Sequence, residues 1–210
     1  MREKLVLIDG HSILNRAFYG VPELTNSEGL HTNAVYGFLN ILFKILAEEQ
    51  PQYLAVAFDL KAPTFRHKMY DAYKGTRKPQ PPQLHEQVPV MKEVLTAMGV
   101  PLLMKEGYEA DDLIGTISRR ANEHGDSCVV VTGDRDSLQL VGGGTTVRLV
   151  TTKMGQTPYD SYDTEKFREK YGFDPIYLID LKALMGDSSD NIPGVPGIGE
   201  KTAMQLLHDF

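Results

Sequence analysis

The sequence predicts an α/β domain with a mainly parallel sheet covered by helices on both faces, followed by a small helical appendage. Short apolar runs alternate with segments in which apolar residues recur every three or four positions, as strands and amphipathic helices do. The first run, at residues 5–8, is apolar throughout, which is typical of a strand buried on both faces. After about residue 160 only helical patterns continue. We therefore divide the chain into a core at residues 1–160 and an appendage at residues 161–210.

Five apolar runs are expected to form the strands of the core. Three of them contain three or more consecutive aliphatic or aromatic residues, and the run that begins at Pro101 is a weaker candidate. They lie at residues 5–8, 53–58, 101–104, 128–132 and 146–150. Strands separated by helices pair in parallel, because a helix returns the chain to the edge where the previous strand began.

Three core helices are expected between these strands. Their apolar residues fall on one face at steps of three and four. Gly99 and Gly125 follow the second and third of them, and glycine commonly ends a helix because it adopts the left-handed conformation without strain. The helices are expected at residues 35–46, 90–98 and 109–124.

The appendage is expected to contain two further helices and no strands. Asp163 is a candidate N-cap and Gly172 a candidate stop for the first. Asp174 and Pro175 then open the second, which runs to Gly186. A proline in the first turn fits, because its missing N–H would be unpaired there in any case.

Composition describes an ordinary globular protein. The chain has 210 residues, 41% hydrophobic and 24% charged, with a formal net charge of -6. That average argues mildly against a nucleic-acid-binding protein, but it hides local patches. The single cysteine, Cys128, excludes a disulfide framework within the chain and fits a reducing cytoplasm. We expect no secretory signal and no membrane span, since no apolar run approaches ~20 residues.

Acidic residues follow several of the expected strands. The carboxyl ends of parallel strands meet at one edge of a sheet, where α/β proteins bind ligands. Oxygen ligands without histidine or cysteine at ligand spacing favour Mg²⁺ or Mn²⁺ over zinc, and so many acids suit two metals about 4 Å apart. Taken singly, each acid could instead be a helix cap or a turn former. The acids are Asp9, Asp59, Glu109, Asp111, Asp112, Asp134, Asp136, Asp187 and Asp190.

Positive charge is concentrated in residues 61–78, which hold six lysines and arginines, one acid (Asp71) and three interleaved aromatic residues. Cations bind backbone phosphates and aromatic rings stack on unpaired bases, so the segment suits single-stranded nucleic acid. The proline-rich flank at residues 79–82 suggests a mobile excursion that orders on binding. A solvated basic loop is the alternative.

A glycine-rich stretch at residues 192–202 resembles a nucleotide-binding loop only superficially. Glu200 separates Gly199 from Lys201, and no apolar strand precedes it, so the phosphate-loop motif is not met. A glycine-rich hairpin before a helix can present backbone N–H groups to a DNA phosphate and bind duplex by shape. A plain connection between two helices is the alternative.

Together these motifs resemble the 5′→3′ nuclease domains of bacterial DNA polymerase I, within the flap endonuclease superfamily and its PIN-like fold. The resemblance covers all 210 residues. Its landmarks are residues 8–10, 34–38, 58–59, 73–77, 108–112, 132–136 and 186–199. The resemblance implies a two-metal phosphodiesterase that removes 5′ ends and cleaves 5′ flaps, in primer removal and DNA repair.

The resemblance also implies roles for individual residues. Asp9, Asp59, Glu109 and Asp111 would surround one Mg²⁺ or Mn²⁺, and Asp134, Asp136 and Asp190 the other, with Asp112 and Asp187 nearby. Residues 61–82 would form an arch or gateway in which Lys74 and Arg77 neutralise the attacked phosphate. The hairpin at residues 192–199 would belong to a helix–hairpin–helix element that holds a monovalent cation such as K⁺. The expected DNA contacts are Arg16, Phe18, Tyr19, Arg66, Tyr73, Lys74, Arg77, Lys78, Gly194, Gly197, Gly199, Lys201 and Thr202.

The implied partners are DNA with a 5′ end or flap and a polymerase domain of the same chain, in the bacterial cytoplasm at the nucleoid. Because the sequence stops at Phe210, inside the helix–hairpin–helix element, we expect a fragment with weakened duplex binding. The alternatives are a catalytically weak DNA-binding module and a stand-alone 5′-3′ exonuclease homologue. A phosphatase is disfavoured, because Asp9-Gly10-His11 lacks the second aspartate of the haloacid dehalogenase type.

Overall fold

A six-stranded sheet forms the centre of the molecule, in the order β3-β2-β1-β4-β5-β6. The computed structural model describes residues 2–152 and 157–210. Neighbouring strands pair in parallel except β6, which pairs antiparallel with β5 at the edge. The strands are β1 (Lys4–Asp9), β2 (Tyr53–Ala57), β3 (Leu102–Leu103), β4 (Ser127–Thr132), β5 (Thr145–Val150) and β6 (Tyr159–Tyr162). All five expected strands are therefore present.

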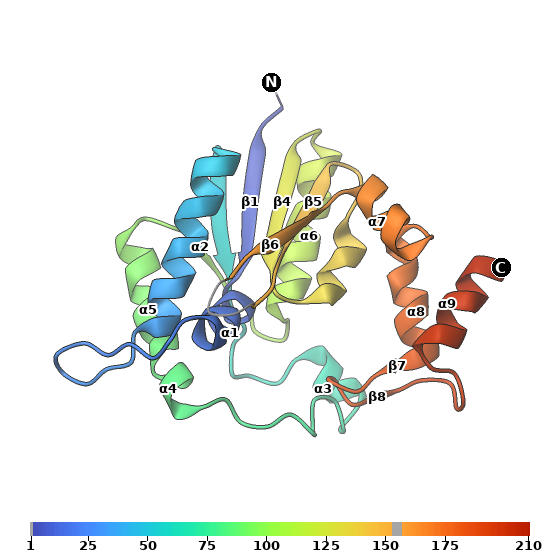
Figure 1. Ribbon diagram of the computed structural model, residues 1–210, viewed down its shortest axis with the longest axis horizontal. Helices are drawn as coiled ribbons and strands as arrows, with labels where there is room; N and C mark the ends of the chain where they lie inside the picture. The colour runs from blue at the N-terminus through green and yellow to red at the C-terminus, as the bar shows by residue number, and fades with distance from the viewer. Residues whose placement is uncertain (1, 153–156) are drawn as a thin grey trace.

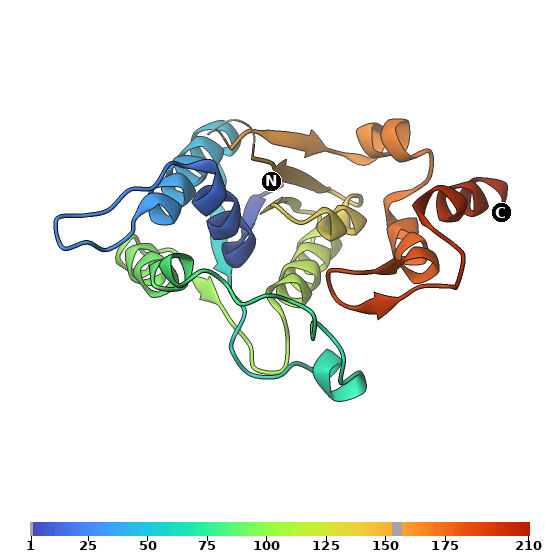
Figure 2. The same cartoon turned by 60° about the horizontal axis from the view of Figure 1, so that its bottom comes forward.

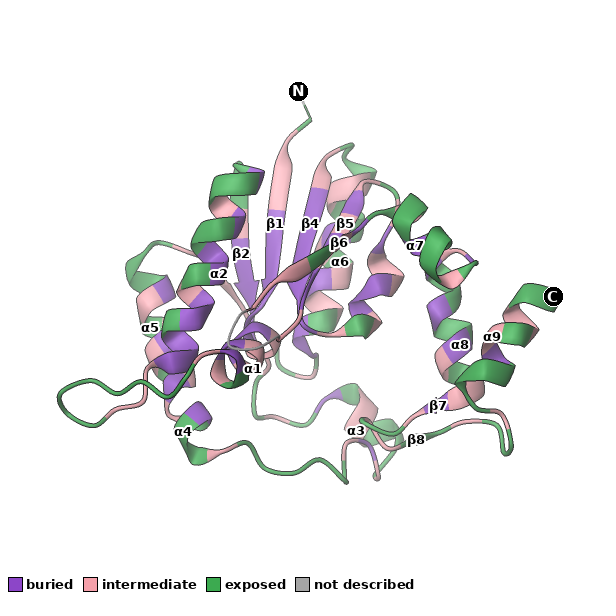
Figure 3. Ribbon diagram, in the orientation of Figure 1, coloured by how far each residue is buried: buried purple, intermediate pink, exposed green. Residues whose placement is uncertain are grey.

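Helices cover both faces of this sheet, as the continuous apolar runs predict (Figure 1). Alternate residues of one strand serve different cores: Val6 and Ile8 pack with α1, α2 and α5, whereas Leu7 packs with α6 on the other face. Figure 3 shows β1, β2, β4 and β5 buried over most of their length and the helices exposed on their outer sides. The core helices are α1 (Gly10–Gly20), α2 (Asn33–Glu49), α5 (Gln87–Ala97), α6 (Ala110–Glu123) and the 3₁₀ helix η1 (Arg135–Leu140).

Residues 61–82, which we call the gateway segment, cross beneath the carboxyl edge of the sheet (Figures 1 and 2). The segment contains one short helix, α3 (Phe65–Met69), and leads into another, α4 (Pro82–His85). Most of its residues are exposed, but Tyr73 is only 5% exposed. The gateway segment therefore packs against the rest of the molecule near its middle, at Tyr73.

The appendage combines helices with a small hairpin. Its hairpin strands, β7 and β8, pair antiparallel directly after α8. Gly186 has φ +77°, and Gly194 lies so close to the end of α8 that a Cβ on it would overlap the backbone of Met185 and Gly186. The elements are α7 (Thr164–Tyr171), η2 (Pro175–Tyr177), α8 (Leu178–Met185), β7 (Gly186–Asp187), β8 (Ile192–Pro193) and α9 (Glu200–Asp209).

The structure corrects two expectations. The prediction that no strand follows residue 150 is wrong, because β6 extends the sheet to Tyr162, across the expected boundary at residue 160, and β7 pairs with β8. The helix α1 was not predicted, although Asp9 caps it by accepting a hydrogen bond from the Ser12 N–H at 3.0 Å. Among the described residues, no helix has the length and apolar character needed to cross a bilayer.

Candidate active site

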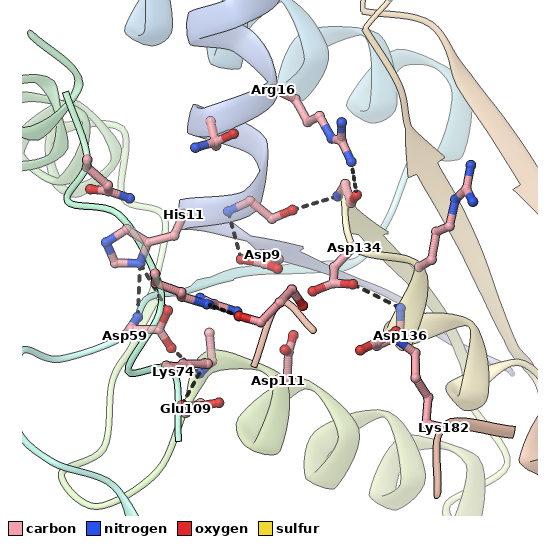
Figure 4. Close-up of a pocket in the computed structure, with 18 residues that line it drawn as sticks. Asp9, His11, Arg16, Asp59, Lys74, Glu109, Asp111, Asp134, Asp136 and Lys182 are labelled. Carbon is pink, nitrogen blue, oxygen red and sulfur yellow. Dashed lines mark hydrogen bonds and ion pairs between the residues drawn. The ribbon is translucent and has the colours of Figure 1, made fainter. Parts of the chain in front are cut away.

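The strand order places two aspartates side by side at the edge where a ligand site is expected. The chain winds from β1 outward to β2 and β3, then returns to β4 beside β1, so β1 and β4 flank the topological switch point. Asp9 ends β1, and Asp134 follows β4 after Gly133. A pocket of about 600 Å³ opens between them (Figure 4).

Six of the nine acids predicted as metal ligands line this pocket. They come from four places in the sequence: the end of β1, the loop after β2, the start of α6 and the loop after β4. All four lie at carboxyl ends of strands or at the helix that follows one. The six acids are Asp9, Asp59, Glu109, Asp111, Asp134 and Asp136.

Burial and mutual repulsion raise the pKa values of the central carboxyls. The pKa of Asp9 rises to about 7, chiefly because the side chain is buried and also because Asp59 and Asp134 face it. Hydrogen bonds from the Ser12 N–H and the Thr132 hydroxyl oppose this rise. The pKa of Asp111 is raised well above its ordinary value, first by burial and then by Asp9 and Asp134. Carboxylates in this setting are stable as anions only when cations join them.

Neighbouring acids on α6 have different surroundings. Asp111 faces the pocket (Figure 4). Asp112 turns toward the gateway segment, where Arg66 donates to both of its carboxylate oxygens at 2.8 Å, and it also accepts from the Glu109 N–H at 2.9 Å. Although burial alone would raise the pKa of Asp112, these hydrogen bonds hold it below its ordinary value. Asp112 therefore acts here as a helix cap and salt-bridge partner outside the pocket.

The gateway segment contacts Glu109 before α6 and Asp190 after β7. Lys74 donates to Glu109 at 2.8 Å, and the Tyr73 hydroxyl lies 3.0 Å from both Glu109 and Asp190, so that its single proton can be donated to either carboxylate. Arg77 pairs with Asp190 at 2.5 Å. Lys74 has φ +56°, a left-handed conformation held by a backbone hydrogen bond to the Asp190 carbonyl at 2.9 Å. Asp190 thus bonds to gateway residues and does not line the pocket.

The remaining ligand candidate, Asp187, also lies outside the pocket lining and pairs with a lysine. Lys182 on α8 contacts Asp136 and Asp187 at 2.9 Å each. Burial would raise the pKa of Asp187, but hydrogen bonds from Ser189 and Lys182 hold it well below its ordinary value. Burial raises the pKa of Asp136 despite its contact with Lys182. Lys182 was not predicted as a site residue.

Some of the predicted DNA contacts are exposed, whereas others are buried or bonded to other groups of the protein. Arg16 lines the pocket and donates to the Gly133 carbonyl at 2.6 Å, whereas Tyr19 is 61% exposed and packs edge-on against Phe18. Buried Tyr73 cannot offer its ring to a base in this arrangement, which departs from the stacking expected of it. The exposed candidates beyond it are Lys78 in the gateway segment, Gly197 and Gly199 in the hairpin region, and Lys201 and Thr202 at the start of α9, whereas Gly194 is half-buried.

Two further polar residues support the carboxylates and were missed by sequence reasoning. His11 accepts a hydrogen bond from the Asp59 N–H at 3.2 Å, and burial lowers the pKa of its imidazole. The Ser12 hydroxyl accepts from the Gly133 N–H at 2.8 Å and so ties α1 to the loop after β4. Their position directly after Asp9 was the available signal, because residues that follow a strand at the ligand edge commonly line the site.

The donor chemistry fits divalent cations that keep part of their water. Within residues 2–152 and 157–210, no three histidine, cysteine, aspartate or glutamate side chains are drawn together closely enough to enclose one ion. Magnesium does not require such a cage, because it commonly binds one or two carboxylates and retains several waters. The pocket, with its oxygen donors and raised pKa values, suits that mode and does not suit a closed zinc site.

The protein-family models and the curated relatives that match this chain agree with each other. The chain matches the family described as "5'-3' exonuclease, N-terminal resolvase-like domain" over residues 4–172 and "5'-3' exonuclease, C-terminal SAM fold" over residues 173–210. DNA polymerase I of Bacillus caldotenax is 53% identical over 210 residues, and that of Bacillus subtilis is 50% identical over 209 residues. Each alignment covers 100% of this chain and 24% of the relative, so the chain spans about a quarter of their length.

Solved structures with low sequence identity share the fold. A T5 5'-exonuclease with bound zinc ions superposes with a TM-score of 0.75 at 23% identity, over 99% of this chain and 75% of that chain. Flap endonuclease-1 from Methanococcus jannaschii superposes with a TM-score of 0.62 at 19% identity, over 99% of this chain and 71% of that chain. At these identities the likeness establishes the fold alone.

Proposed function

The chain belongs to the 5'-3' exonuclease family, and from this membership we propose that it is a structure-specific DNA nuclease that uses two divalent metal ions to remove 5′ ends and cleave 5′ flaps. The observation that carries the proposal is the pocket at the switch point, where six carboxylates from four segments converge. The raised pKa values of Asp9 and Asp111 support it, because bound cations would return these carboxyls to the anionic form.

We assign the acids to two groups by the elements of the fold that carry them. Bound Mg²⁺ or Mn²⁺ ions would polarise the phosphodiester and lower the pKa of the attacking water. One group surrounds the ends of β1 and β2 and the start of α6, and the other joins the loop after β4 to the loop after β7. The groups are Asp9, Asp59, Glu109 and Asp111, with Asp112 behind them, and Asp134, Asp136, Asp187 and Asp190.

The gateway segment and the hairpin supply the proposed DNA contacts. Lys74 and Arg77 line the pocket and would pair with the attacked phosphate, while Arg16 borders it from α1. The N–H groups of Gly194, Gly197 and Gly199, with Lys201 and Thr202 on the next turn, suit a phosphate of duplex DNA, and K⁺ could bind the hairpin at residues 192–199. The other proposed contacts are Phe18, Tyr19, Arg66, Tyr73 and Lys78.

The relatives suggest the setting of this activity. Because they are DNA polymerases of which this chain spans about a quarter, we propose that a polymerase domain in the same chain works with the nuclease in primer removal and DNA repair. Such a protein would act in the bacterial cytoplasm at the nucleoid.

Cleavage of a 5′-flap substrate labelled at its 5′ end tests the proposal directly. We expect short labelled products with Mg²⁺ and none with EDTA. Asp111→Asn combined with Asp134→Asn should remove activity while preserving shape, and Asp160→Asn, an exposed change on β6, is the matched control. Cleavage that persists in EDTA or in the double variant would contradict the metal mechanism. A nicked duplex without a flap separates exonuclease from flap cleavage.

A DNA-binding module with little catalysis is the second candidate. It is favoured by the ion pairs of the site, in which Arg66, Lys74, Arg77 and Lys182 each hold acids of the proposed ligand set. Binding of flap DNA, followed by fluorescence anisotropy, without cleavage at any Mg²⁺ or Mn²⁺ concentration would select this candidate.

A further inference from the structure

Lys182 occupies a distinctive position between the core and the appendage. Its stem belongs to α8, and its ammonium lies 2.9 Å from Asp136 Oδ1 after β4 and 2.9 Å from Asp187 Oδ2 in the hairpin. The side chain is 36% exposed and lines the pocket (Figure 4). One monovalent charge therefore holds together two carboxylates that come from different modules and belong to the same proposed ligand group.

A lysine is chemically suited to stand in for a metal ion here. Its ammonium is a compact point charge, and its flexible four-carbon stem lets it move without disturbing the helix. It carries a single positive charge, whereas the two carboxylates that it contacts carry two negative charges. A divalent cation would neutralise both carboxylates more strongly than one ammonium does.

We propose that Lys182 is an internal counter-ion that occupies the Asp136–Asp187 half of the site without metal and competes with a divalent cation for these carboxylates. The inference rests on the proposed function, because it needs a cation at this half of the site. Lys182 thereby lowers the affinity for that cation. When no cation is bound, it adds an ion pair to the apolar contacts between the appendage and the core.

A purely structural lysine makes the opposite prediction. If Lys182 only ties Asp187 to Asp136, its removal loosens the ligand group and weakens cation binding. If it competes, its removal tightens binding. A divalent and a monovalent charge about 5 Å apart in a water-like dielectric repel enough to change affinity about tenfold. The sign of the change therefore separates the two roles.

Binding of Mn²⁺, measured from the free-ion electron paramagnetic resonance signal, tests the proposal without any dependence on cleavage. We expect Lys182→Met to bind one Mn²⁺ about tenfold more tightly than the original protein and Lys182→Arg to bind it with nearly unchanged affinity. Lys44→Met removes the same charge from an exposed position on α2 and should leave Mn²⁺ binding unchanged. Unchanged or weaker binding in Lys182→Met would overturn the inference.

A second measurement uses the unaltered protein, in case Lys182→Met does not fold. The side-chain ¹⁵N resonance of Lys182, assigned with Lys182→Arg, should move toward that of a free lysine as Mg²⁺ is added. A resonance that stays unchanged at saturating Mg²⁺ would overturn the competition. If the original protein binds no Mn²⁺ at all, the proposed function fails and this inference falls with it, whereas bound Mn²⁺ without an effect at Lys182 refutes the inference alone.

Discussion

Replacing Asp9 by asparagine should remove a pH-dependent destabilisation of the metal-free protein. Asparagine has the same shape, can accept the Ser12 N–H at the start of α1 as Asp9 does, and carries no charge. The folded protein raises the pKa of Asp9 from 3.8 to about 7, first through burial. An acid whose pKa is raised on folding favours the folded state at low pH, and this contribution is lost as the pH rises through the folded-state value.

The size of the effect follows from the two pKa values. Their difference is about 3 units, and each unit corresponds to about 1.4 kcal/mol, which gives an upper limit of about 4 kcal/mol. About 2 to 3 kcal/mol of this falls between pH 5 and pH 8, since the unfolded chain is already ionised at pH 5. Asp9→Asn should therefore already exceed the unfolding free energy of the original protein by about 1 to 2 kcal/mol at pH 5, and this advantage should grow by roughly a further 2 to 3 kcal/mol by pH 8.

Urea unfolding in EDTA at pH 5, 6, 7 and 8 measures this difference. The exposed Asp160→Asn is the control and should give a difference that does not vary with pH. Saturating Mg²⁺ at pH 8 should stabilise the original protein more than Asp9→Asn, because bound ligand adds stability only where its site is intact. If Asp9→Asn were less stable at every pH, or its advantage did not grow between pH 5 and pH 8, the raised pKa of Asp9 in the folded protein would be refuted.

Three other changes give direct expectations. Gly194→Ala should destabilise the hairpin by about 1–3 kcal/mol, because its Cβ would overlap the backbone of Met185, and should weaken duplex binding in an anisotropy titration. Arg66→Gln should raise the pKa of Asp112 toward its ordinary value in a carbon NMR titration, because both charged hydrogen bonds are lost. Gly37→Ala should lower the unfolding free energy by about 1–3 kcal/mol, because its Cβ would lie 2.8 Å from a methyl carbon of α1.

The sheet and the convergence of acids could be predicted because both depend on local pattern. A continuous apolar run identifies a buried strand, and parallel pairing brings the residues after such strands to one edge. Asp9, Asp59, Asp111 and Asp134 met this condition, and they line the same pocket. The missed strand β6 has the sequence Tyr-Asp-Ser-Tyr, whose polar centre gives no apolar run and suits an edge position.

The partners of the acids could not be predicted, because they depend on how distant segments pack. Asp112 and Asp111 are adjacent in the sequence, but successive residues on a helix point in different directions, and only Asp111 reaches the pocket. Lys182 lies within an otherwise mainly apolar helix, where a lysine usually marks a solvent-exposed position. Its two acid partners became apparent only from the packing of α8 beside η1.

Lysine and arginine side chains pair with the acids of the site, so a bound metal ion would change which of these cations are available to DNA. The gateway segment contacts the site through ion pairs, and the appendage adds an ion pair to the apolar contacts that join it to the core, as in Lys74–Glu109, Arg77–Asp190 and Lys182–Asp136. A bound metal ion would displace the ammonium or guanidinium from its carboxylate. The released group can then bind a DNA phosphate instead. Metal binding and DNA binding should therefore be coupled: Mg²⁺ should raise the affinity for flap DNA, and the Lys182→Met change should reduce that gain.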